Sequence, residues 1–178
     1  MDFAILDFIQ ENLRCGFLDA VMPVITVSAK AGLVWIGLAV LLVISPKTRK
    51  AGAAVAVALI LHLIVVNITL KPLVDRPRPF EINTAIELIA KAPHDGSFPS
   101  GHSSASFAAA TAVFLYNRQM GIAALVLAAV IAFSRLYLYF HFPTDVLAGT
   151  LIGVGLGYLS KVIIEKFSSN KNNGVITL

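Results

Sequence analysis

Long apolar stretches alternate with short polar segments along this chain. Residues 20–44 and 51–70 are nearly continuous apolar runs, and each exceeds or matches the roughly 20 residues that a helix needs to cross a bilayer. Three further apolar runs follow at residues 103–116, 121–133 and 146–164. The pattern predicts an all-α fold, a polytopic membrane bundle with five spanning helices.

The two ends of the chain are more polar. Residues 3–14 mix apolar and charged side chains, which is typical of a short amphipathic helix at a membrane surface or, equally, of a helix packed on the bundle. Residues 1–19 are therefore predicted to be an interfacial segment, which makes five to six helices. They lack the pattern of a cleavable signal peptide, so we expect them in the mature protein. Residues 168–178 are predicted to form a polar tail.

The segment 71–99 is rich in proline and in charged residues. Such a segment cannot cross the hydrocarbon layer, because its backbone polar groups would lack partners there. It is predicted to be an extramembrane loop that contributes to the active site.

Basic residues suggest the orientation of the chain. If each apolar run crosses the membrane, one set of basic residues lies on one side, which the positive-inside rule assigns to the cytoplasm. The long loop and the turn at His141 then face the extracytoplasmic side of the plasma membrane. The four cations in residues 71–91 run against this rule unless function retains them. The cytoplasmic set is Lys47, Arg49, Lys50, Arg118, Lys161, Lys166 and Lys171.

Composition supports a membrane protein and limits the alternatives. Hydrophobic residues make up 57% of the chain and charged residues 13%, with a mean hydropathy of +0.82, which is unlike a soluble domain. Residues 1–178 leave room for a single domain. The net charge of +4 does not indicate a nucleic-acid partner, because the basic residues flank apolar runs. Cys15 is the single cysteine, so no intrachain disulfide can form.

Two features inside the apolar runs have a simple packing interpretation. Gly153 and Gly157 have the spacing that allows two helices to approach closely. His62 lies within the second apolar run, with Asn67 and Thr69 near its end. A histidine at membrane depth is a candidate functional group, although a packing role is the simpler interpretation.

Three polar clusters flank the apolar runs, all on the same predicted side. In the first, residues 71–79, Lys71 offers a mobile point charge and Arg78 a planar fork, a combination that suits a phosphate. Alone, such a run is more typical of an interfacial anchor.

The second cluster, residues 96–102, immediately precedes an apolar run. Ser100 is a plausible helix N-cap, and Gly101 would let an anion approach the free N–H groups of the first turn. His102 could hold or donate a proton beside that anion. An ordinary capped helix with an incidental histidine explains this cluster equally well.

The third cluster contains Ser134 and Arg135, followed by His141 and Asp145. Pro143 suits the first helical position, which places Asp145 in the first turn and near His141. A carboxylate bound to one imidazole nitrogen would leave the other free to attack. Alone, Asp145 is better explained as a partner of the helix dipole.

Together the clusters supply a nucleophile, an orienting acid, a proton donor and three cations, which is the inventory of a phosphoryl-transfer site. Two histidines and one aspartate could ligate zinc. However, Lys71, Arg78 and Arg135 would repel a cation, so neither a metal nor another cofactor is expected.

These residues resemble the type 2 phosphatidic acid phosphatase (PAP2) superfamily. Its pattern is K-x6-R-P, then P-S-G-H, then S-R-x5-H-x3-D, and no position departs from it here. The chain fills the pattern with Lys71, Arg78, Pro79, Pro99, Ser100, Gly101, His102, Ser134, Arg135, His141 and Asp145.

The resemblance implies roles for these residues. His141 would attack phosphorus and become phosphohistidine, Asp145 would orient it, and His102 would protonate the departing oxygen. The phosphoryl oxygens would be held by Lys71, Arg78, Ser100, Gly101 and Arg135.

The resemblance also implies a lipid phosphatase in the cell membrane, with membrane lipids around it. Its substrate would be undecaprenyl diphosphate, phosphatidylglycerophosphate or phosphatidate, and an outward-facing site favours the first. Two alternatives remain: a vanadate-dependent haloperoxidase, since those soluble enzymes share the motifs, and a non-catalytic protein that binds or transports a lipid phosphate.

Overall fold

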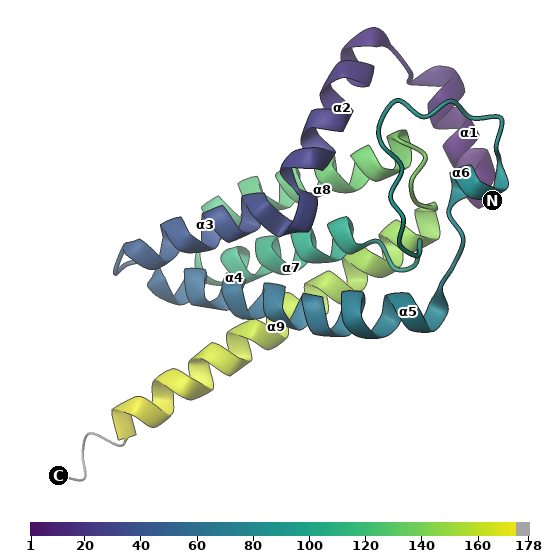
Figure 1. Cartoon of the computed structure of the whole chain (residues 1–178). Helices are drawn as coiled ribbons and strands as arrows, with labels where there is room; N and C mark the ends of the chain where they lie inside the picture. The colour runs from purple at the N-terminus through teal and green to yellow at the C-terminus, as the bar shows by residue number, and fades with distance from the viewer. Residues whose placement is uncertain (174–178) are drawn as a thin grey trace.

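The computed structural model describes the backbone of residues 1–173, and the side chains of residues 1–169 except residue 31. Helices account for most of this range, and no strand occurs in it, which confirms the all-α prediction (Figure 1). The predicted count of five to six helices is too low, because one predicted span is broken and short helices occur in the long loop.

The N-terminal third contains a bend that periodicity did not reveal. The helices α1 (Asp2–Asn12) and α2 (Gly16–Ser28) are followed by a 3₁₀ turn (Lys30–Gly32) and α3 (Leu33–Ile44). The axes of α2 and α3 differ by 55°, and Gly32 takes a left-handed φ of 72° at the break. The predicted interfacial segment 1–19 therefore includes the start of a second helix.

The second apolar run forms one long helical stretch of changing pitch. The helix α4 (Arg49–His62) continues into a π-helix (Leu63–Leu70) and then α5 (Lys71–Val74). A π-helix is rare and has a wider turn than an α-helix. The loop predicted at 71–99 thus begins only after Val74, and it contains the short helix α6 (Pro79–Ile82).

The helix α7 (Gly101–Tyr116) lies at the centre of the bundle and packs against α4, α8 (Arg118–Tyr137) and α9 (Pro143–Asn173). Alanines on α7 are fully buried, and α9 faces it with a stripe of glycines. A Cβ added at Gly153 would lie 2.4 Å from the Ser104 carbonyl oxygen, and one at Gly157 would lie 2.6 Å from Thr111 Cβ. The predicted packing role of these glycines is confirmed, and Gly149 extends the stripe toward the site.

Three helical stretches in the described chain are long and apolar enough to cross a membrane: Arg49–Ile82, Arg118–Tyr137 and Pro143–Ser169. The bent pair of α2 and α3 makes a fourth if it counts as one span. The helix α7, predicted as a fifth, has only 16 residues. The predicted polar tail begins as part of α9, and residues 174–178 lie outside the described range.

The polar clusters lie at one end of the bundle. The end of α5, the start of α7, the end of α8 and the start of α9 meet there, beside α1 (Figure 1). The C-terminal end of α9 projects from the opposite end.

Candidate active site

The three sequence clusters meet at this end of the bundle and contact one another directly. Arg78 Nη1 lies 3.2 Å from His141 Nε2, which joins the first cluster to the third. The Ser100 backbone N–H donates to the Asp145 backbone carbonyl at 3.0 Å, which joins the second to the third. The glycine stripe permits this contact, because a Cβ at Gly149 would lie 2.5 Å from the Ser100 carbonyl oxygen.

The imidazole of His141 is buried and has a different partner at each nitrogen. Nδ1 lies 3.7 Å from Asp145 Oδ2 and 3.4 Å from Ser97 Oγ. Nε2 faces the guanidinium of Arg78. Nδ1 is therefore on the side of the Asp145 carboxylate, and Nε2 is directed toward the cations.

Asp145 has a nearly complete set of donors. Its carboxylate is fully buried and accepts from Ser97 Oγ at 2.5 Å, the Phe142 N–H at 2.9 Å and Arg76 Nη1 at 2.6 Å. A buried carboxylate requires such partners, because removing a charge from water is costly. Ser97 and Arg76 were not predicted as site residues. Both lie in the long loop, where their spacing gave no signal of this contact.

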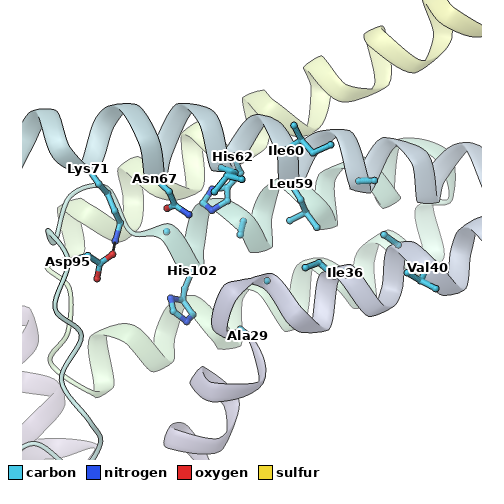
Figure 2. A pocket seen from close by; sticks show the side chains of 16 residues that line it. Ala29, Ile36, Val40, Leu59, Ile60, His62, Asn67, Lys71, Asp95 and His102 are labelled. Atoms are coloured by element: carbon cyan, nitrogen blue, oxygen red, sulfur yellow. Dashed lines mark hydrogen bonds and ion pairs between the residues drawn. The ribbon is translucent and has the colours of Figure 1, made fainter.

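A second carboxylate lies between two of the cations. The Asp95 carboxylate accepts from Lys71 Nζ and, at 2.8 Å, from Arg78 Nη2 (Figure 2 shows the Lys71 contact). Arg78 Nε also donates to the Asp95 carbonyl at 2.8 Å. Asp95 was not predicted either. Its position shortly before the second cluster was the available signal.

The start of α7 has the predicted cap. The Ser100 hydroxyl accepts from the Ser103 backbone N–H at 3.4 Å and from Ser103 Oγ at 2.9 Å. A Cβ added at Gly101 would lie 3.6 Å from Lys71 Cε, so this lysine side chain passes close to the first turn. An anion held there would meet both a cation and a helix N-terminus.

Arg135, in the last turn of α8, is buried beneath the site. It donates to Thr26 of α2, and its guanidinium lies over the Phe140 ring, 4.7 Å from the centroid. Its Nε is one of two buried side-chain polar atoms without a partner in the part of the chain described. A buried guanidinium N–H without an acceptor is suited to an anionic oxygen.

Burial and the cations alter the ionisation of the site. Burial lowers the pKa of His141 well below its usual value, and the charges of Arg135 and Arg78 lower it further. For His102, burial followed by the charges of Arg135 and Lys71 lowers the pKa to about 3. Both imidazoles are therefore neutral at neutral pH.

The pKa of Asp95 shifts in the direction that keeps its carboxylate charged. Burial alone would raise its pKa, but the hydrogen bond and charge of Lys71, with the charge of Arg78, outweigh burial and lower the pKa of Asp95 to about 2. This carboxylate remains an anion between two cations at neutral pH.

A cavity of about 590 Å³ leads away from the cations between α3 and α4. Its polar end is lined by Lys71, Asp95, Gly101 and His102, and Figure 2 shows the Lys71 and Asp95 side chains close together there. The remainder is mainly apolar, as a lipid chain requires, with His62 and Asn67 between the two parts. The apolar lining includes Ile36, Ala39, Val40, Ala56, Leu59 and Ile60.

Residues 51–169 match the model of the PAP2 superfamily, and this region carries all three clusters. The chain belongs to the PAP2 superfamily. The expected membership is thereby confirmed, and the clusters described above are the PAP2 motifs in place at the helix ends of this bundle.

Curated relatives of this PAP2 chain have lipid-phosphate activities in their names. An undecaprenyl-diphosphatase of Sulfolobus acidocaldarius is 32% identical over 128 residues, which are 71% of this chain and 62% of the relative. The undecaprenyl-diphosphatase BcrC of Bacillus subtilis is 32% identical over 142 residues, 80% of this chain and 72% of that protein. The match thus spans less than two thirds of the Sulfolobus protein.

Two solved structures share the PAP2 fold. Aquifex aeolicus LpxE superposes with a TM-score of 0.72 at 27% identity, covering 89% of this chain and 93% of LpxE. A transmembrane PAP2-type phosphatidylglycerolphosphate phosphatase from Bacillus subtilis gives a TM-score of 0.72 at 26% identity, covering 93% and 85%. The arrangement of helices is therefore shared with a transmembrane PAP2-type phosphatase.

Proposed function

We propose that this PAP2 protein hydrolyses a lipid diphosphate through a phosphohistidine intermediate on His141, with undecaprenyl diphosphate as the favoured substrate. The proposal rests mainly on the orientation of one imidazole. His141 Nδ1 faces the buried Asp145 carboxylate, whereas Nε2 faces Arg78. This is the arrangement that prepares one nitrogen to attack an anionic group.

In the first step the lone pair of His141 Nε2 forms a bond to the terminal phosphorus. The bond from phosphorus to the leaving oxygen breaks, and that oxygen takes the electron pair and a proton from His102. Asp145 accepts the Nδ1–H and balances the positive charge that develops on the ring. The products of this step are phosphohistidine and the lipid carrying one phosphate fewer.

In the second step water attacks the phosphohistidine. His102, now neutral, accepts the proton of the water, the N–P bond breaks, and inorganic phosphate departs. A bound phosphate offsets the charges of Arg135 and Lys71, which otherwise lower the pKa of His102. His102 therefore gains its proton together with the substrate.

The cations would stabilise the charge on the transferred group. The charges of Lys71, Arg78 and Arg135 all act on His141, and a phosphate bound there would also meet Ser100 and Gly101 at the start of α7. Preorganised charges and N–H groups of this kind are usually the largest contribution to phosphoryl transfer.

The cavity and the relatives support this choice of substrate class. A groove lined by aliphatic side chains leads from the cations and suits a lipid chain. Two of the relatives are named undecaprenyl-diphosphatases. The distribution of basic residues favours a site on the extracytoplasmic face of the plasma membrane, where a spent carrier lipid would be met.

Phosphate release by the detergent-purified protein, in EDTA, tests the proposal. Undecaprenyl diphosphate, phosphatidylglycerophosphate, phosphatidate and a soluble phosphate ester form the panel. We expect preferred hydrolysis of the first, and an acid-labile phosphoryl label on wild type that His141→Ala lacks. No release from any substrate by folded protein would overturn the proposal in favour of lipid binding or transport, and full turnover by His141→Ala would remove His141 as nucleophile.

A further inference from the structure

Two polar side chains at membrane depth have no part in the catalytic steps above. His62 ends α4, and Asn67 lies in the π-helix that follows. Figure 2 shows the side chains of Lys71, Asn67 and His62 in a row along this stretch, facing the side of the cavity where His102 lies. Polar groups within a membrane bundle are costly, and those that line a cavity are candidates for ligand binding.

The π-helix determines this row. Its hydrogen bonds run from residue i to i+5, so the turn is wider than in α4 and the side chains after it are rotated relative to an α-helical register. Lys71, immediately after the π-helix, lies together with Asn67 near the start of α7. Single π-turns within α-helices occur frequently at functional sites.

The row converges on the start of α7. Measured from a Cβ built at Gly101, Asn67 Oδ1 lies at 3.4 Å, Lys71 Cε at 3.6 Å and His62 Cε1 at 3.9 Å. Gly101 precedes His102, the proton donor to the leaving oxygen. His62 and Asn67 therefore lie where the leaving group begins, between the cations and the apolar groove.

Both side chains have a donor available for a ligand. His62 Nδ1 lies 3.2 Å from the hydroxyl of Ser104, which is fully buried. When that hydroxyl donates to Nδ1, Nε2 carries the ring proton. Within the described residues the Asn67 amide makes no side-chain hydrogen bond, although it lines the cavity.

We propose that His62 and Asn67 bind the second, leaving phosphate of a lipid diphosphate and so select diphosphates over monophosphates. The inference rests on the proposed phosphatase activity and adds its specificity. A diphosphate places charged oxygens beside these donors, whereas a monophosphate ester places carbon there. Neutral donors suit this position, because the lipid monophosphate must leave after the first step.

The test compares two substrates in three variants of the full chain. Asn67→Leu and His62→Leu replace each donor by an aliphatic side chain like those of the groove. Thr69→Val, on the same π-helix but outside the cavity lining, is the matched control. We expect Asn67→Leu and His62→Leu each to lower kcat/KM for undecaprenyl diphosphate about tenfold relative to phosphatidate, and Thr69→Val to leave the ratio unchanged.

Inhibition supplies an independent measurement. Methylenediphosphonate should inhibit Asn67→Leu about tenfold more weakly than wild type, while inhibition by inorganic phosphate stays the same. Equal losses on both substrates, or an unchanged ratio, would overturn the inference. If His62→Leu fails to fold after losing its Ser104 contact, Asn67→Ala at an exposed position decides the matter alone.

The inference and the proposed function fail differently. Wild-type protein that hydrolyses phosphatidate as readily as undecaprenyl diphosphate would overturn the inference and leave the phosphatase intact. Wild-type protein that releases phosphate from neither would overturn both.

Discussion

The site contains two carboxylates with opposite surroundings. Asp145 is fully buried and bonded to Ser97, Arg76 and a backbone N–H, while the Asp95 side chain is 57% exposed and joins Lys71 to Arg78. Asp145 lies behind the imidazole of His141, on the side away from Arg78. Asp95 takes the donors that a phosphate oxygen would take.

This difference separates a fixed part of the site from an exchangeable part. A buried carboxylate with several donors is held in one position, because any movement would leave a charge unpaired. An exposed carboxylate can exchange its partners for water at little cost. In the proposed mechanism, His141 would thus be oriented before substrate arrives, whereas the Asp95 carboxylate would yield its cations to the phosphate.

The largest effect is expected from Asp145→Asn. The amide would present an N–H to His141 Nδ1 and favour the wrong tautomer, and loss of turnover of about 10⁴-fold accompanies such a change in an orienting aspartate. Phosphate release from the preferred lipid measures it, with Glu87→Gln, an exposed carboxylate of the long loop, as the control. Retention of most activity would mean that Asp145 does not set the tautomer.

Gly149→Ala tests the backbone that holds the fixed part. The added Cβ would lie 2.5 Å from the Ser100 carbonyl oxygen, so α9 must move from α7 at a cost of about 1–3 kcal/mol. A lower thermal midpoint and reduced kcat are expected. Gly155→Ala, with nothing within 4 Å of its Cβ, should leave both unchanged or raise the midpoint slightly. Equal behaviour of the two variants would contradict the packing argument.

Asp95→Asn should have a smaller effect than these substitutions, and it should strengthen the binding of phosphate. Removing the carboxylate leaves Lys71 and Arg78 without their anion, so inorganic phosphate should inhibit several-fold more strongly. Inhibition constants for phosphate report the change, and Glu87→Gln should show none. Weaker inhibition would show instead that Asp95 positions the two cations.

The smallest effect is a titration shift without any substitution. The pKa of His102 is lowered to about 3, so without added phosphate its ring should remain neutral as pH falls from 7 to 5. Adding a phosphate analogue should raise that pKa, because the anion offsets Arg135 and Lys71. Histidine-labelled NMR in detergent would follow it. An unchanged pKa would place the anion away from His102.

The sequence was sufficient for the residues that carry local signals. Ser100 caps α7 and the glycines of α9 face a neighbouring helix, because capping and close packing depend on residue types at fixed spacing. The three clusters also lie together as predicted, because every second connection between successive helices lies at the same end of a bundle.

The site residues that were not predicted depend on tertiary contacts, which residue spacing does not encode. The partners Ser97, Arg76 and Asp95 come from an irregular loop, whose path is set by the helices it crosses. The break at Gly32 and the π-helix also went unpredicted. A continuous apolar run looks the same whether its helix is straight, bent or widened.

The number of residues in the π-helix helps to determine the geometry of this site. Deleting one residue between Leu63 and Leu70 would rotate everything beyond it by about 100° relative to α4, turning Lys71 away from the start of α7. A one-residue deletion in the turn after α3, at the opposite end of the bundle, would shorten that turn and leave the site residues in place. Insertions and deletions in relatives should therefore be confined to the turns and absent from this segment.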